Sequence, residues 1–328
     1  MVDVTVVLLE GGLPSTSMAP LEIFACAGTL WGMLMGTPAE PRFRVRTATI
    51  DGRKTQNFVP VALEPTSSLA DIGDTDLVVV PTAGMDLGQA RAQHARVVEW
   101  IAARAEKSAV AGICTGATLL AAAGLLKGRP ATTHWGVVEH ARLMYPDVQW
   151  KADRFVTESE KVFCGGGLYA SIDLSLYLVE HYCGHEVAVQ TAKALLLETP
   201  RIWQSTYAAQ PPRSSHDDEG IQRAQQWLFE HFREPIDLDA LAARVGMSPR
   251  NFARRFKAAT GEAPLAYVHR LRIDSARHFL ENAQRSVQEI CTAVGYEDVA
   301  FFRTLFRRHT GTSPREYRAR FGPRKADA

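Results

Sequence analysis

The sequence predicts an α/β domain built on a largely parallel sheet, followed by a separate domain made only of helices. In the first two thirds of the 328 residues, apolar β-branched runs alternate with helical stretches, which is typical of an α/β domain with a largely parallel sheet. A segment rich in proline and serine then shows no periodicity, and only helical periodicity follows it. We therefore expect an α/β domain at 1–198, a linker at 199–219, a helical domain at 220–322 and a tail at 323–328.

The strands of the first domain are expected where short, strongly apolar runs occur, because strands buried on both faces carry little polar sequence. These runs are residues 4–9, 43–50, 77–80 and 109–113. The connecting helices are expected to include residues 20–34 and 91–106.

The composition is that of a globular protein of the cytoplasm. Hydrophobic residues make up 46% of the chain and charged residues 22%, which argues against a disordered or fibrous protein. No apolar run reaches the roughly 18 residues of a membrane span, and the first residues lack the basic start of a secretory signal. The five cysteines are odd in number and scattered, so we expect no disulfide framework and a reducing compartment.

The charge is unevenly distributed, although the formal net charge is only +1. Residues 221–328 carry 19 Lys+Arg against 12 Asp+Glu, a net charge of +7, so the rest of the chain has a net charge of −6. Nearly all these cations are arginines, which favour bidentate contacts to phosphate and guanine. The asymmetry indicates that the helical domain meets a polyanion.

The helical domain contains an internal repeat. LAARVG at 241–246 matches ICTAVG at 290–295 in its apolar positions. Downstream, Phe252, Phe256, Gly261, Pro264 and Tyr267 recur fifty positions later as Phe302, Phe306, Gly311, Pro314 and Tyr317. Helix, glycine, short turn and helix form a helix-turn-helix unit, so the repeat predicts two such units joined by a spacer helix at 265–281.

The second helix of each unit has predictable ends and a predictable inner face. Ser248 with Pro249 after it, and Asp298, are suitable starts, and glycines at 261 and 311 are suitable stops. The repeated phenylalanines should pack inward. The outward faces then carry Arg250, Arg254 and Lys257 on one helix, and Ala300, Arg303 and Arg307 on the other.

A basic stripe on these helices is what entry into the major groove of double-stranded DNA requires. If both units read one face of the duplex, their recognition helices should lie about 34 Å apart. The alternative is an all-helical interaction domain whose arginines are only solvated.

The segments GMSPRNFARRFKAATG and GYEDVAFFRTLFRRHTGTSPREYRARF resemble the AraC/XylS family of DNA-binding domains, over about residues 221–321. The resemblance implies base contacts from Arg250, Arg254, Val299, Ala300, Arg303 and Thr304. Val299, Ala300 and Phe301 stand where many relatives have hydrogen-bonding side chains. Apolar groups there would contact thymine methyls, or the second unit would contribute mostly phosphate contacts.

A candidate reactive site lies between an expected strand and a helix of small residues in the first domain. Gly112-Ile113-Cys114-Thr115-Gly116 has the spacing of a nucleophile elbow with cysteine in place of serine. We expect the helix N-terminus to lower the pKa of the Cys114 thiol, and His134 offers an imidazole. Cys114 is either a pocket or sensing residue or a nucleophile, and His134 either contacts a ligand or is structural.

Together with RFVTES and CGGGLYASIDL, the elbow resembles the PfpI/class I glutamine amidotransferase-like superfamily, which implies a flavodoxin-like (PfpI-type) first domain. The whole chain is similar to the GlxA-type regulators, which join such a domain to an AraC-type reader; the family implies a homodimer. Thr16 stands four positions before Pro20, where many members have an acidic residue. One means of tuning the cysteine is therefore missing, and Glu22 and Asp173 are further candidates for the same ligand pocket.

Two other clusters have simpler interpretations. His181, Cys183 and His185 offer three metal ligands, but Gly184 separates two expected helices there, so we expect no metal site and no cofactor. The three glycines at 165–167 precede a helix, where they would either receive an anion or allow close packing.

Two hypotheses result. In the first, the chain is a non-catalytic transcription regulator that binds a double-stranded DNA operator and forms a homodimer. Its α/β domain either senses an unknown small-molecule effector or mediates the dimerisation, and RNA polymerase is a further partner. In the second, it is a cysteine-dependent hydrolase, hydratase or amidase that acts on a small nitrogenous or carbonyl compound through Cys114 and His134. The residue Thr16 in place of an acid, and the +7 helical domain, favour the regulator.

Overall fold

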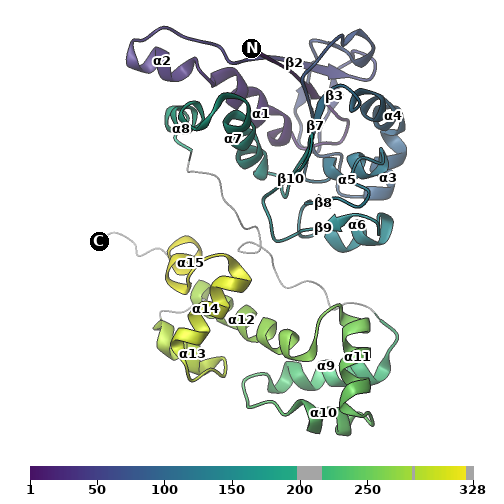
Figure 1. The fold of residues 1–328 in the computed structure, drawn as a ribbon, viewed down its shortest axis with the longest axis vertical. Coiled ribbons are helices and arrows are strands. Elements are labelled where there is room, and N and C mark those ends of the chain that lie inside the picture. The colour runs from purple at the N-terminus through teal and green to yellow at the C-terminus, as the bar shows by residue number, and fades with distance from the viewer. Residues whose placement is uncertain (198–215, 283–284, 323–328) are drawn as a thin grey trace. The chain divides into compact units, whose positions relative to one another are not determined.

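A seven-stranded sheet runs through the first of the two units into which the chain divides, Met1–Gln204 and Ser205–Ala328 (Figure 1). The computed structural model describes residues 1–197, 216–282 and 285–322. The predicted linker as far as residue 215, and the tail, lie outside the described residues, so the domain boundaries stay predictions.

The sheet is parallel except at one edge, as the apolar runs of the sequence predict. Its strand order is β10-β11-β7-β6-β1-β2-β5, and only β10 and β11 pair antiparallel. The strands are β1 (Val2–Val7), β2 (Phe43–Thr49), β5 (Ser67–Ser68), β6 (Leu77–Val80), β7 (Ala109–Ile113), β10 (Val156–Ser159) and β11 (Val162–Gly165). Two predicted strands match β6 and β7, the other two overlap β1 and β2, and the sequence analysis did not predict β5, β10 or β11.

Helices cover both faces of this sheet, which gives the first unit three layers (Figure 1). Apolar residues of α1 (Ser15–Cys26), α7 (Ala170–Cys183) and α8 (His185–Ala194) share one buried cluster with the sheet. The opposite face is covered by α3 (Leu87–Gln93), α4 (Ala95–Arg104), α5 (Gly116–Ala122) and α6 (Val138–Met144). Smaller elements are α2 (Leu30–Met35), a 3-10 turn (Leu69–Asp71), and the strand pairs β3 (Thr55–Gln56) with β4 (Ala62–Leu63) and β8 (Pro130–Ala131) with β9 (Gln149–Trp150).

The predicted helix at 20–34 is wrong in its extent. It is two helices, α1 and α2, and the chain turns between them at Gly28, which has a φ of +75°. A Cβ atom at Gly28 would lie 2.1 Å from the carbonyl oxygen of Glu40, so only glycine allows this approach. Pro20 therefore lies inside α1 and does not open it. The predicted helix at 91–106 is likewise divided at His94 into α3 and α4.

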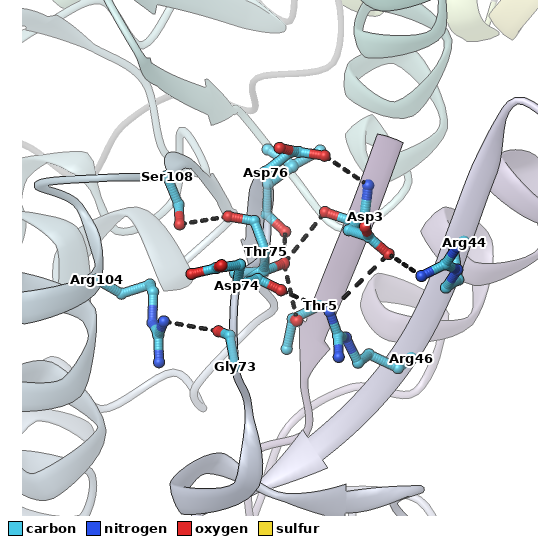
Figure 2. Close-up of polar contacts among 11 residues, drawn as sticks. Asp3, Thr5, Arg44, Arg46, Gly73, Asp74, Thr75, Asp76, Arg104 and Ser108 are labelled. Atoms are coloured by element: carbon cyan, nitrogen blue, oxygen red, sulfur yellow. Dashed lines mark hydrogen bonds and ion pairs between the residues drawn. The ribbon is translucent and has the colours of Figure 1, made fainter. Parts of the chain in front are cut away.

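Polar contacts tie the amino ends of the central strands together (Figure 2). The backbone N–H of Asp3 donates to Asp76 Oδ2 at 2.8 Å, and the Ser108 hydroxyl donates to the Thr75 carbonyl at 2.6 Å. The hydroxyls of Thr5 and Thr75 are 3.0 Å apart in the interior. These contacts join β1 to the segments before β6 and β7, so these polar groups have a structural role at the amino ends of the strands.

All the regular secondary structure described in the second unit is helical, as predicted. Its helices are α9 (Glu219–His231), α10 (Leu238–Arg244), α11 (Pro249–Thr260), α12 (Pro264–Asn282), α13 (Val287–Ala293), α14 (Val299–Thr310) and α15 (Pro314–Phe321). Helices α9 to α11 lie at one end of α12 and α13 to α15 at the other (Figure 1). Each group forms its own apolar cluster with α12. The sequence repeat is therefore a repeat of two small cores.

Candidate DNA-binding surface and thiol site

The two repeat units end their second helices in the same way. Gly261 and Gly311 are left-handed, with φ values of +80° and +79°, and their N–H groups donate to carbonyls of the last helical turn. Just before them, the hydroxyls of Thr260 and Thr310 lie 2.7 and 2.9 Å from the carbonyls of Phe256 and Phe306. Both helices are therefore twelve residues long and end at equivalent positions of the repeat.

The starts of the helices differ. The Asp298 carboxylate accepts hydrogen bonds from the N–H groups of Ala300 and Phe301, at 2.7 and 3.1 Å, as predicted. Ser248 occupies the N-cap position of α11, but its hydroxyl makes no capping hydrogen bond. The cap prediction for Ser248 is therefore correct in position and wrong in mechanism, and Pro249 removes one unsatisfied N–H at this end instead.

The repeated aromatic residues pack inward, as predicted. Phe252, Phe256, Phe302 and Phe306 are buried. Phe256 meets Tyr267 edge to face at 5.2 Å between ring centroids, and Phe306 meets Tyr317 in the same way at 5.5 Å. Equivalent rings therefore fix the outer face of each second helix.

The predicted DNA-contacting side chains lie on those outer faces. Exposed members are Arg250, Arg254, Lys257, Ala300, Arg303, Thr304 and Arg307. Within the described residues, none of the five cations among them lies within ion-pair distance of a carboxylate, although Arg307 acts electrostatically on Glu316. Val299 differs, because it is half-buried against the second cluster.

One arginine of α11 has a structural role that the sequence does not reveal. Arg255 forms a bidentate ion pair with Asp218, at 2.9 and 2.7 Å. The guanidinium holds the pKa of the Asp218 carboxyl below its ordinary value, and the same carboxylate caps α9 through the N–H of Ile221. Arg255 therefore joins α11 to α9, whereas Arg250 and Arg254 face solvent.

The predicted elbow is present at the carboxyl end of β7. Cys114 connects β7 to α5 with a φ of +55°, a strained value for a residue with a side chain. A Cβ atom at Gly116 would lie 2.3 Å from the Val80 carbonyl oxygen, and one at Gly112 would lie 2.8 Å from Ala117 Cα. The glycines are needed because backbone passes on both sides of the turn.

The expected activation of the thiol is wrong. Cys114 has no exposed surface, and this burial raises the pKa of its thiol to about 11. Hydrogen bonding to the Thr82 side chain and to the backbone at Thr115 and His134 acts in the opposite direction but is the smaller effect. Helix α5 does not compensate for the loss of water around the sulfur.

Three other predicted residues lie around the elbow. The Thr115 hydroxyl accepts from the N–H of Ala83 at 3.0 Å, and the Thr16 hydroxyl accepts from the N–H of Thr82 at 3.1 Å. His134 is half-buried, which lowers its pKa, and its Nδ1 accepts from the N–H of Gly136 at 3.0 Å. Thr16 thus holds the segment at Thr82, which contacts the sulfur of Cys114. An acidic residue at position 16 would have been able to change its charge there, whereas threonine stays neutral.

The remaining candidates, Glu22 and Asp173, are not among the groups that shift the pKa of the Cys114 thiol. Glu22 is exposed on α1 and acts electrostatically on Cys26, one turn away. Asp173 is buried in the first turn of α7, the helix that packs beside α1. A cavity of about 450 Å³ lies at the opposite, amino edge of the sheet, and its lining includes Asp76, Lys107 and Lys161.

The histidine–cysteine cluster and the triple glycine have structural contacts. His181 Nδ1 lies 3.7 Å from Glu158, and His185 Nδ1 lies 2.9 Å from Glu180, so the two rings face different carboxylates. No group of three metal-binding side chains converges among the described residues. The Gly165 carbonyl accepts from the N–H of Cys114 at 2.8 Å, and the N–H of Gly166 donates to Phe155, which favours the packing interpretation.

Comparisons with known proteins agree with this two-part structure. A helix-turn-helix domain model matches residues 241–320, and the DJ-1/PfpI family model matches residues 30–181. The chain is 30% identical to the HTH-type transcriptional regulator CdhR of Pseudomonas aeruginosa, over 70% of this chain and 68% of CdhR. The chain belongs to the GlxA-type family of HTH-type transcriptional regulators.

Other relatives carry the same kind of name. The HTH-type transcriptional regulator GlxA of Rhizobium meliloti is 29% identical over 65% of this chain and 66% of its own. GbdR of Pseudomonas aeruginosa is 26% identical over 84% and 75%. Drosophila melanogaster DJ-1beta shares the fold of the first unit, with a TM-score of 0.51 and 20% identity over 60% of this chain and 98% of that protein. No helix in the described part of this regulator is both long and apolar enough to cross a membrane.

Replacing Gly116 with alanine should lower the free energy of unfolding by about 2–3 kcal/mol, because the new methyl group would collide with backbone oxygens that cannot move independently. Thermal or urea unfolding of the full chain measures this. Gly73→Ala is the matched control, since a Cβ there meets nothing within 4 Å. Equal stability of the two variants would contradict the close approach.

Alkylation by iodoacetamide should be very slow at Cys114 in the folded regulator at neutral pH, because the thiolate form becomes dominant only above about pH 11. Mass spectrometry of labelled peptides over a pH series measures the rate. The half-buried Cys26 and Cys183 are internal references. Rapid labelling of Cys114 near pH 7, ahead of these two, would show that the thiol is activated after all.

Proposed function

We propose that the regulator binds a double-stranded DNA operator with α11 and α14 as its recognition helices. The observation that carries this proposal is the pair of equivalent helices whose outer faces hold cations without carboxylate partners in the described chain. Arg250, Arg254 and Arg303 are assigned to base edges, and Lys257 and Arg307 to phosphates. Such cations release counterions when they neutralise phosphates, which makes binding favourable and dependent on salt.

The second helix-turn-helix unit, which contains α14, is proposed to read DNA more by apolar contact than the first, which contains α11. Ala300 is exposed, and Phe301 beside it exposes 47% of its surface. The Thr304 hydroxyl lies 3.0 Å from the Ala300 carbonyl and so has an acceptor within its own helix. Methyl groups of thymine are the base features that suit such a surface. Val299 is assigned to the core of the unit, with at most an edge contact to DNA.

The α/β unit, Met1–Gln204, is proposed to act as a sensor of a small molecule and not as an enzyme. Its fold keeps the turn of an enzyme, but the thiol is buried and protonated at neutral pH. His134 and the neighbouring Trp135 are half-buried at the carboxyl edge of the sheet, the edge at which open α/β sheets bind ligands. We assign effector contact to these two side chains, with Cys114, Thr115 and Thr16 shaping the wall behind them.

A homodimer, contact with RNA polymerase and a cytoplasmic location complete the proposal. Operators read by dimeric helix-turn-helix proteins have two-fold symmetry, so a dimer here would place four recognition helices on one operator. An effector would change DNA affinity only as far as it binds the two states of the regulator differently.

Substituting Arg250, Arg254 or Arg303 by alanine should weaken specific binding by about 1–3 kcal/mol each, because each change removes a bidentate contact to a base edge. Lys257→Ala and Arg307→Ala should weaken binding to all sequences alike and reduce the salt dependence by about one counterion each. The measurement is fluorescence anisotropy with the full chain, on a duplex selected from a random library, at several salt concentrations.

The control for this series is Arg223→Ala on α9, an exposed arginine that pairs with Glu219 and lies on neither recognition helix. It should bind like the wild type. Affinity that does not respond to salt, or equal losses from Arg223 and Arg250, would reject the assigned surface.

Cys114→Ser should leave the affinity of the effector-free regulator for its operator unchanged, because the groups that contact the sulfur in the described residues, Thr82, Thr115 and His134, belong to the α/β unit and not to the proposed recognition helices. The same anisotropy titration measures this, together with an assay for turnover of amides, nitriles and carbonyl compounds by the wild type. Turnover that the substitution abolishes would establish the cysteine-dependent enzyme and would reject the non-catalytic sensor.

A further inference from the structure

Arg272 occupies an unusual position between the two helix-turn-helix units. It lies in the middle of α12, and only 9% of its surface is exposed. Its guanidinium donates to three carbonyl oxygens: Nε to Phe232 at 2.6 Å, Nη2 to Glu234 at 2.7 Å and Nη1 to Gly295 at 2.8 Å. The first two belong to the turn between α9 and α10 of the first unit, and the third is the turn glycine of the second.

These three bonds make a rigid joint because the donor is planar. A guanidinium presents its N–H groups in a fixed fork, and hydrogen bonds from a charged donor are stronger than neutral ones. In the described chain Arg272 has no carboxylate within ion-pair distance, so the carbonyls carry the stabilisation of this buried charge. Movement of either turn away from the other would leave the guanidinium partly unsatisfied, which is costly in the interior.

A second observation places the same two turns in direct contact. Gly295 has a φ of +87°, and a Cβ atom there would lie 2.4 Å from the carbonyl oxygen of Arg233. The backbone at Arg233, in the first helix-turn-helix unit, therefore approaches the turn at Gly295 of the second more closely than a side chain at position 295 would permit. The contact lies beside the carbonyls that Arg272 binds.

The joint also reaches the second recognition helix. The Arg272 guanidinium lies over the ring of Tyr296, 4.9 Å from its centroid. Tyr296 meets Phe301 and Phe302 of α14 at ring distances of 5.8 and 5.9 Å, and its hydroxyl lies 2.8 Å from His269 Nδ1. A displacement of Arg272 would therefore be felt at the start of α14.

We propose that Arg272 is a positioning residue that fixes α14 relative to the first helix-turn-helix unit. The regulator then accepts only one spacing between the two DNA boxes that its helix-turn-helix units read. The proposal rests on the proposed use of α11 and α14 as recognition helices. With the joint intact, the second box is bound at high effective concentration and in one register. Without it, the units behave as two tethered modules, and both the gain from the second box and the spacing requirement diminish.

The test compares full-length wild type, Arg272→Met and Arg272→Lys on three duplexes derived from a sequence that the wild type selects from a random library. One duplex keeps both footprinted boxes, one has the second box scrambled, and one has a half-turn insertion between them. For the wild type, scrambling or insertion should reduce affinity about tenfold or more. For Arg272→Met, the intact duplex should bind no better than the other two, whereas affinity for the single box should stay as in the wild type. Lysine retains the charge but not the fork, so Arg272→Lys should fall between them.

The matched control is Arg277→Met, which removes another largely buried arginine of α12. Arg277 contacts Asp274 on the same helix and Tyr317 in the second unit. Its thermal stability should fall, but the preference for one spacing should remain. Unfolding temperatures of all variants separate loss of fold from loss of register.

Two results would overturn the proposal. Retention of the wild-type spacing preference in both Arg272 variants would show that α12 alone fixes the register. Parallel loss of affinity for the intact and single-box duplexes, in Arg272→Lys as well as Arg272→Met, would show a purely structural role. A wild type that protects only one box would instead refute the assignment of α14 as a recognition helix, which is a distinct outcome.

Discussion

Burial of one helix on two separate cores determines the architecture of the DNA-binding unit. The first half of α12 supplies Tyr267, Val268 and Leu271 to one apolar cluster, and the second half supplies Ile273, Ala276 and Leu280 to the other. Since burial of apolar surface is the main stabilising term in folding, each unit depends on this helix for its core. Both helix-turn-helix units are thereby attached to one helix, and Arg272 lies at the point where this helix passes from one core to the other.

The α/β unit, Met1–Gln204, has the backbone turn of an enzyme without a reactive thiol. The strained turn at Cys114 survives because Gly112 and Gly116 admit the neighbouring backbone, and because Thr133 donates a hydrogen bond to the Cys114 carbonyl at 2.8 Å. Reactivity requires in addition an environment that stabilises the thiolate. Here the sulfur is enclosed, and Thr16 supplies a hydroxyl to the loop beside it instead of a charge. Geometry and acidity are separable properties of the same turn.

Periodicity and spacing predicted those features of this chain that depend on local sequence. The strands β6 and β7, the inward phenylalanines and the glycine stops all follow from patterns within a few residues of each other. The sequence did not predict the antiparallel β10, because its residues are half-buried or exposed and form no apolar run. It also did not predict the division of the helix at Gly28, because its cause is the distant Glu40 carbonyl. It also failed for the pKa of Cys114 and for the roles of Arg255 and Arg272, since burial and the convergence of backbone oxygens depend on tertiary structure. The exposed arginines of α11 and α14 were correctly placed, but their contacts to DNA stay predictions.

The acceptors of Arg272 are all main-chain oxygens, and this has an evolutionary consequence. Side chains at 232 and 234 are free to diverge as far as the joint is concerned, because every amino acid supplies the same carbonyl. The constraint falls on two positions only, the donor at 272 and the glycine at 295. Proteins that share this joint are therefore able to diverge at the exposed residues of α11 and α14 while the distance between these two helices stays the same.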